Sequence, residues 1–194
     1  MNCAKCETRD CARCEEAMLF SEEAALGYQD DVTRSMAAAA RQIEATYYGQ
    51  ACRVEELIRF AEQMGYERLG VAFCVGLTEE ARCLVELLEN HFEVSSACCK
   101  VCGLTRSDAG ILPPGESGPG GTTCNPVGQA LALARDDTQL NIIVGLCMGH
   151  DVLFAKHSRA PVTTLVVKDR VLAHNPVGAI YSRYIRRTLR PEPQ

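Results

Sequence analysis

The chain has 194 residues and a net charge of −5, with 47% apolar and 23% charged residues, which is typical of a globular protein. The negative charge does not favour a nucleic-acid or anionic-membrane partner. We see no apolar run of transmembrane length and no secretory signal, so we expect a cytoplasmic protein. In that compartment the twelve cysteines should be reduced and available for metal binding or catalysis.

Four cysteines near the N-terminus have the spacing C-x2-C-x4-C-x2-C: Cys3, Cys6, Cys11 and Cys14. The segment has too little apolar content to fold unaided, so we expect these cysteines to bind a metal. A tetrahedral zinc site is one interpretation, although zinc ribbons usually separate their two cysteine pairs by more residues. The last three cysteines also match one iron–sulfur spacing, with the fourth ligand upstream instead of downstream. The alternative is four unliganded thiols in a flexible tail.

Residues 15–64 have a helical pattern, including an amphipathic helix that ends near Gly65. We therefore expect a cysteine-rich lobe with a helical layer over residues 1–66 and an α/β domain over residues 67–194, or one integrated domain. Cys52 and Cys83 lie in helical patterns and are expected to be small buried residues.

Strands and helices alternate from residue 68 onward. Apolar runs predict strands at 68–74, 92–98, 142–146 and 162–167, and a short further strand at 170–173. Thr78 should cap the first intervening helix, with Leu84, Leu87 and Leu88 on its buried face. Asn-Pro pairs at 125–126 and 175–176 predict two further helix starts. This alternation predicts an α/β fold, with a parallel sheet of at least four strands and helices on both faces.

Several cysteines follow the predicted strands or precede a predicted helix. The carboxyl ends of parallel strands meet at one edge of a sheet, where α/β proteins bind their ligands, so we expect these thiols to gather there. Thiolates at such positions suit soft metals or nucleophilic chemistry, and a helix N-terminus favours the thiolate form. The alternative is that each is a small core residue. The cysteines are Cys74, Cys98, Cys99, Cys124 and Cys147, and Cys102 is close enough in sequence to join them.

Polar residues beside these cysteines are further candidates. His150 and Asp151 follow Cys147 and are candidate catalytic residues, although a buried histidine and a helix-capping aspartate explain them equally well. The candidates for contacting a cofactor are Asn125, Gly149 and His174. Residues 103–123 contain six glycines and three prolines and are expected to form a lid or binding loop. No phosphate-binding or dinucleotide-binding glycine motif is present.

Several segments resemble a family of cysteine-rich bacterial and archaeal proteins, the domain of unknown function 1847, whose members are usually labelled only as metal-binding proteins. The segments are Arg-Val-Glu-Glu-Leu at 53–57, Gly-Val-Ala-Phe-Cys-Val-Gly-Leu at 70–77, Cys-Cys-Lys-Val at 98–101, Cys-Asn-Pro at 124–126, Gly-Leu-Cys-Met-Gly-His-Asp at 145–151, Lys-Asp-Arg at 168–170 and His-Asn-Pro at 174–176. The resemblance covers nearly the whole chain and implies metal binding without an established reaction.

Three hypotheses follow. The first is an iron–sulfur protein with a cluster at the sheet edge and a second metal centre at the N-terminus, which passes electrons or acts on a small substrate. The second is a zinc protein with a structural four-cysteine zinc and a thiol or zinc active site, acting as a hydrolase or a metal carrier. The third is a non-enzymatic redox or metal sensor. The expected partner is a small molecule or a redox protein, with self-association and enzymatic activity left open.

Overall fold

The computed structural model of the protein describes residues 2–8, 10–112, 118 and 120–190. The chain forms two compact units, residues 1–52 and 53–194. The middle of the predicted lid, residues 113–117 and 119, lies outside the described residues. Of the helices that are described, none combines the length and the apolar character needed to cross a membrane.

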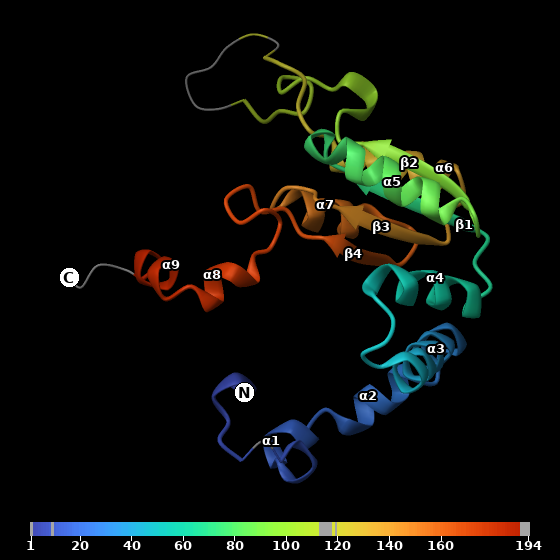
Figure 1. Ribbon diagram of the computed structural model, residues 1–194, viewed down its shortest axis with the longest axis vertical. Coiled ribbons are helices and arrows are strands. Elements are labelled where there is room, and N and C mark those ends of the chain that lie inside the picture. Colours follow the sequence, from blue (N-terminus) through green and yellow to red (C-terminus); the bar gives the residue numbers. More distant parts are fainter. Residues whose placement is uncertain (1, 9, 113–117, 119, 191–194) are drawn as a thin grey trace. The chain divides into compact units, whose positions relative to one another are not determined.

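The first unit is helical, as predicted. Two short 3-10 helices, η1 (Cys3–Lys5) and η2 (Cys11–Arg13), are followed by α1 (Glu15–Met18), α2 (Ser21–Gly27) and α3 (Asp31–Tyr47) (Figure 1). Asp30 caps α3, because its carboxylate accepts a hydrogen bond of 2.7 Å from the Thr33 N–H. Ala39 and Ile43, one turn apart on α3, are buried.

The second unit contains a four-stranded sheet whose strands all run parallel, in the order β2-β1-β3-β4. This confirms the predicted α/β fold. Its elements are α4 (Arg53–Gln63), β1 (Arg68–Phe73), η3 (Val75–Leu77), α5 (Thr78–Leu88), β2 (Glu93–Cys98), η4 (Val101–Gly103), α6 (Pro126–Arg135), β3 (Leu140–Val144), α7 (His150–His157), β4 (Val162–Val166), α8 (Val177–Tyr181) and α9 (Arg183–Thr188).

The burial of the strands follows their order in the sheet. β3 is buried along its whole length and β1 over its four central residues, as expected for inner strands covered on both faces. The outer strands β2 and β4 are only partly buried. Figure 1 shows α5 in front of the β1–β2 half of the sheet and α6 behind it, and α6 also contacts α7. Helices therefore cover both faces, as predicted.

The strand order creates a switch point between β1 and β3. The chain leaves β1 through α5 toward β2, and leaves β3 through α7 toward β4, on the other side of the sheet. Ligands of open α/β sheets bind at the carboxyl ends of strands where the order reverses in this way. The two turns touch at this edge, because a Cβ at Gly145, after β3, would overlap the Leu77 side chain. Gly145 also has a φ of 62°, which favours glycine.

Two predictions about α5 were wrong. Thr78 does not cap the helix, because it is already the first helical residue and its hydroxyl donates to the Val75 carbonyl at 2.8 Å. Leu87 is 54% exposed, whereas Leu84 and Leu88 are buried. The latter two lie four residues apart and define the buried face, and Leu87 falls on its flank.

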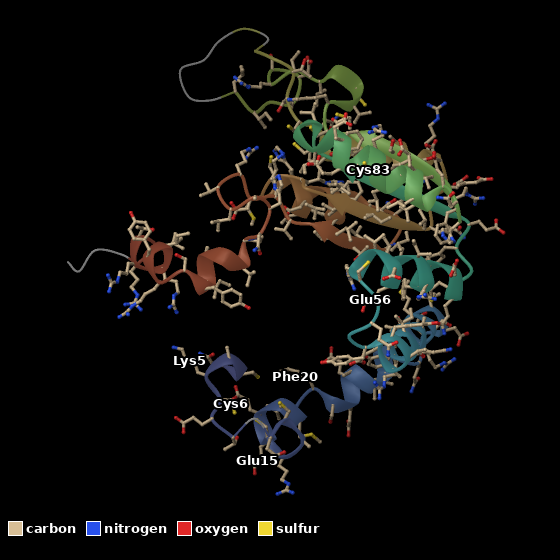
Figure 2. All side chains as sticks on the ribbon, in the orientation of Figure 1. Lys5, Cys6, Glu15, Phe20, Glu56 and Cys83 are labelled. Atoms are coloured by element: carbon tan, nitrogen blue, oxygen red, sulfur yellow. The ribbon has the colours of Figure 1, made fainter. Side chains whose placement is uncertain are left out.

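Three further local predictions also failed. Residues 170–173 form turns instead of a strand, because the Asp169 carboxylate accepts hydrogen bonds from the backbone of this segment. The helix after Pro176 begins at Val177 with no side-chain cap. Cys52 and Cys83 are exposed instead of buried, and Figure 2 shows Cys83 on α5.

Candidate functional site

Three cysteines from separate segments meet at the carboxyl edge of the sheet. Cys74 follows β1, Cys99 follows β2, and Cys124 lies two residues before α6. The Sγ atoms of Cys99 and Cys124 are 3.8 Å apart. Cys74 lies close enough to Cys99 for the Cys99 side chain to help lower the pKa of Cys74. The sequence-based expectation that strand-end thiols gather is therefore met for these three residues.

Backbone hydrogen bonds hold the three segments together. The Cys99 N–H donates to the Phe73 carbonyl at 2.9 Å, which continues the β1–β2 ladder by one residue. The Asn125 N–H donates to the Cys99 carbonyl at 2.8 Å, which attaches the start of α6 to the end of β2. The Asn125 side chain caps α6 by accepting from the Gly128 N–H at 2.8 Å. Asn125, a predicted cofactor contact, thus has a structural role in placing Cys124.

Gln129 on α6 binds the backbone at the ends of β1 and β2. This role was not predicted from the sequence. Its side chain is fully buried, and its Nε2 donates to the Ala97 carbonyl at 2.7 Å and to the Phe73 carbonyl at 3.1 Å. Its Oε1 has no hydrogen-bond partner among the described residues. A glutamine in a helix carries no sequence signal for such a role, because its partners are backbone groups of distant strands.

Cys74 and Cys99 have opposite electrostatic surroundings. Burial raises the pKa of Cys74, but hydrogen bonds from Lys168 and from the Gly76 backbone, together with the charge of Lys168, outweigh burial and lower that pKa overall. The Lys168 Nζ lies 2.8 Å from the Cys74 Sγ. Burial raises the pKa of Cys99 to about 12, against a hydrogen bond from the Val75 N–H. Without metal, Cys99 therefore keeps its proton more strongly than an ordinary cysteine, whereas Cys74 releases its proton more readily.

The remaining strand-end cysteines differ in exposure and in their partners. Cys98, the last residue of β2, is half-buried, and Cys102 is exposed with a left-handed φ of 69°. Cys147 is half-buried, and its Sγ accepts a hydrogen bond from the Arg170 guanidinium at 3.1 Å. Across the described parts of the chain, no three Cys, His, Asp or Glu side chains are already arranged around a common metal position.

The segment after β4 supplies both cations that reach these thiols. Lys168 and Arg170 flank Asp169, whose carboxylate accepts hydrogen bonds from the backbone two and three residues ahead, at 2.9 and 2.8 Å. The Asp169 N–H donates to the Nδ1 of His174 at 3.1 Å. Ala173 and His174 both adopt left-handed φ values, 49° and 61°, which cost energy for residues other than glycine. His174 therefore shapes the loop that presents Lys168 and Arg170.

No role for Lys168 or Arg170 was predicted from the sequence, where they stand out through the Lys-Asp-Arg segment of the family resemblance.

Asp151 in the Gly149–Asp151 segment has a structural role at the start of α7. The Asp151 carboxylate accepts from the Gly149 N–H at 2.9 Å and from the Val152 N–H at 2.8 Å, so it stabilises the helix start. The His150 backbone N–H donates to the Cys147 carbonyl at 2.9 Å. A catalytic role for the His150 and Asp151 side chains stays a prediction.

The N-terminal cysteines belong to the first unit. Cys3, Cys6 and Cys11 are exposed and Cys14 is half-buried. Figure 2 shows Cys6 in the segment between η1 and η2, where its Sγ lies 3.4 Å from the Thr8 hydroxyl. Metal binding by these four residues stays a prediction.

The fold and this edge define a cysteine-rich α/β protein with a cluster of thiols at the carboxyl end of a parallel sheet. The chain belongs to the family described as "Protein of unknown function (DUF1847)", whose model matches residues 11–165. It is 44% identical over 190 residues to the uncharacterized protein MJ0455 of Methanocaldococcus jannaschii. The aligned region covers 97% of this chain and 98% of that protein. No solved structure matches the chain. The family resemblance seen in the sequence is thereby confirmed.

Proposed function

We propose that the protein binds a soft metal through thiolates at the carboxyl edge of the sheet, with Cys74, Cys99 and Cys124 as ligands. The observation that carries the proposal is the 3.8 Å separation of the Cys99 and Cys124 sulfurs. In a tetrahedral site with metal–sulfur bonds of about 2.3 Å, neighbouring sulfurs are about 3.8 Å apart. This pair therefore already has the spacing of two thiolates on one ion, such as zinc.

The chemistry of the donors supports the same proposal. Thiolates select soft metals, and a thiol loses its proton when it binds one, even when its own pKa is high. The backbone hydrogen bonds at Cys99 and Asn125 already fix the three segments. Closing the site then requires the Cys74 side chain to turn toward the Cys99–Cys124 pair. Cys98, next to Cys99 in the chain, is a candidate fourth ligand, but the end of β2 must also twist, because successive side chains of a strand point to opposite faces.

An iron–sulfur cluster is the second candidate. It is favoured by the number of thiols, since Cys74, Cys98, Cys99 and Cys124 provide the four ligands that such clusters use. This form needs a larger change, because thiolates on different irons are held apart by the iron and sulfide between them. In either form, the N-terminal cysteines would hold a separate centre.

The position of the centre suggests what it serves. It lies where open α/β sheets bind their ligands, so we infer that a small substrate or a redox partner protein reaches it there. Reduced thiols are required, which agrees with a cytoplasmic location. If the protein is a non-enzymatic metal or redox sensor, it would use the same centre but would catalyse no reaction.

Anaerobic purification of the full chain, followed by an absorption spectrum and by zinc, iron and sulfide analysis, tests the proposal. We expect Cys99→Ser and Cys124→Ser to lose one metal centre each, and the matched control Cys83→Ser, which changes an exposed thiol on α5, to keep the full complement. Zinc without sulfide supports the single ion, and iron with acid-labile sulfide supports the cluster. Full metal content in both site variants, or a wild type that binds no metal, contradicts the proposal.

A further inference from the structure

We propose that Lys168 belongs to this metal centre, as the hydrogen-bond donor and compensating charge for the Cys74 thiolate. The inference rests on the proposed function and adds a residue that is not a ligand. Lys168 is therefore a positioning residue, which acts on the metal through the sulfur of Cys74.

The charge of the centre requires such a group. Three thiolates and one divalent ion carry a net negative charge, and a fourth thiolate increases it. Cys74 is 6% and Cys99 is 2% exposed, so this charge would lie largely out of contact with water. A charge in such surroundings is costly unless it is paired or hydrogen-bonded. The Lys168 ammonium group, 2.8 Å from the Cys74 Sγ, supplies both.

The lysine reaches the site from a distant part of the fold. Cys74 follows β1 and Lys168 follows β4, with β3 between these strands in the sheet. The long side chain therefore crosses the carboxyl end of β3. Its Nζ lies 3.4 Å from the point where a Cβ of residue 76 would stand, which is van der Waals distance, so the ammonium group packs closely against the turn that follows Cys74.

Two details indicate that this placement is built into the fold. Hydrogen bonds of Asp169 and His174 hold the loop after β4 in place, although the left-handed φ values of Ala173 and His174 cost energy. In addition, no carboxylate of the described residues forms an ion pair with Lys168, so its observed partner is the thiol. Arg170 does not substitute for it, because its guanidinium donates to Cys147.

Metal affinity of charge variants tests the role directly. The full chain would carry serine at the four N-terminal cysteines, so that only the sheet-edge centre binds metal. Zinc affinity is then measured by competition with a chromophoric chelator, under anaerobic conditions. Lys168→Met removes the charge and the donor at similar length, and Lys168→Arg keeps both. Lys156→Met, on the exposed side of α7, is the matched control for loss of one positive charge.

We expect Lys168→Met to bind zinc roughly tenfold to a hundredfold more weakly, the usual effect of losing an outer partner of a metal ligand. Lys168→Arg should retain most of the affinity, and Lys156→Met all of it. With cobalt(II) as a second probe, the sulfur-to-metal absorption of saturated Lys168→Met should match the wild type, because the same thiolates bind. This spectrum also shows that the variant is folded.

Two outcomes overturn the inference, and they are distinguishable. If Lys168→Met binds zinc as tightly as Lys156→Met does, Lys168 has no part in the centre although the centre exists. If the parent protein with all four N-terminal serines binds neither zinc nor cobalt, the proposed function fails and the inference fails with it.

Discussion

Replacing Gln129 should destabilise the strand ends that carry the thiols without changing any proposed metal ligand. In Gln129→Leu the volume is kept but the donor is lost, so the Ala97 carbonyl loses its bond of 2.7 Å and the Phe73 carbonyl its bond of 3.1 Å. Both carbonyls keep a bond within the sheet, because the Phe73 carbonyl accepts from the Cys99 N–H and the parallel register of Phe73 with Cys98 pairs the Ala97 carbonyl with the Phe73 N–H. The variant therefore loses two additional hydrogen bonds, each worth about 0.5–1.5 kcal/mol. Removing the unpartnered Oε1 recovers part of this cost, so we expect the metal-free protein to lose about 1–2 kcal/mol.

Gln129→Glu should cost more, and its cost should depend on pH. At neutral pH an ionised carboxylate would face two carbonyl oxygens in a fully buried site, which costs roughly 3–5 kcal/mol. Burial raises the pKa of such a carboxyl group, so the cost is present above its folded pKa and decreases as the pH falls and the group takes up a proton. Denaturation in urea, followed by circular dichroism at neutral and mildly acidic pH, measures both effects. Wild-type stability for Gln129→Leu, or a pH-independent loss for Gln129→Glu, would show that Gln129 does not hold these strands.

Two further predictions concern the same edge of the sheet. Because the pKa of Cys99 is raised to about 12, the metal-free protein should lose stability as the pH rises from the ordinary thiol pKa toward 12, since only the unfolded thiol ionises in that range. By linkage, the wild type should lose roughly 1–2 kcal/mol more than Cys99→Ala between pH 8 and pH 10 in reducing buffer, and equal losses would contradict this. Gly145→Ala should cost roughly 2–5 kcal/mol in urea denaturation, from its left-handed φ and the overlap with Leu77. Gly65→Ala, with φ 68° but open space around it, should cost only the backbone part of about 1–2 kcal/mol, and equal costs for both would exclude the overlap.

The fold could be predicted from the sequence because its signals are local. The two inner strands are apolar runs that end in glycine or cysteine, and the Asn125-Pro126 pair marks the start of α6 as expected. The gathering of Cys74, Cys99 and Cys124 then follows from parallel pairing alone, since parallel strands end at one edge. What failed was the detail of ends and turns, as at Thr78 and Leu87, where one side-chain hydrogen bond or a small rotation about the helix axis decides the outcome.

The residues around the thiols could not be predicted in the same way. Gln129 forms two hydrogen bonds and Lys168 one, to groups 32 to 94 positions away in the chain, and neither residue type is unusual in its segment. The predicted cofactor contact of His174 stays a prediction, and its Nδ1 accepts a hydrogen bond from the backbone of the loop that carries Lys168. These roles depend on which strands are neighbours, and a pattern of single residues contains no such information.

For Cys147, the strand order determines where the residue lies, and a separate loop determines where its side chain points. Cys147 follows β3, which pairs in parallel with β1, so it lies at the same edge of the sheet as the end of β1. The direction of its side chain is set by the loop after β4, whose Arg170 donates to the Cys147 Sγ at 3.1 Å. The same loop sends Lys168 to Cys74, so one short segment pairs a cation with a thiol at the end of each inner strand. An N–H group can keep its hydrogen bond to a sulfur that also binds a metal, so the role proposed for Lys168 at Cys74 would apply equally to Arg170 if Cys147 joins the centre. The loop after β4 would then supply a positive charge to a thiolate at the end of each inner strand.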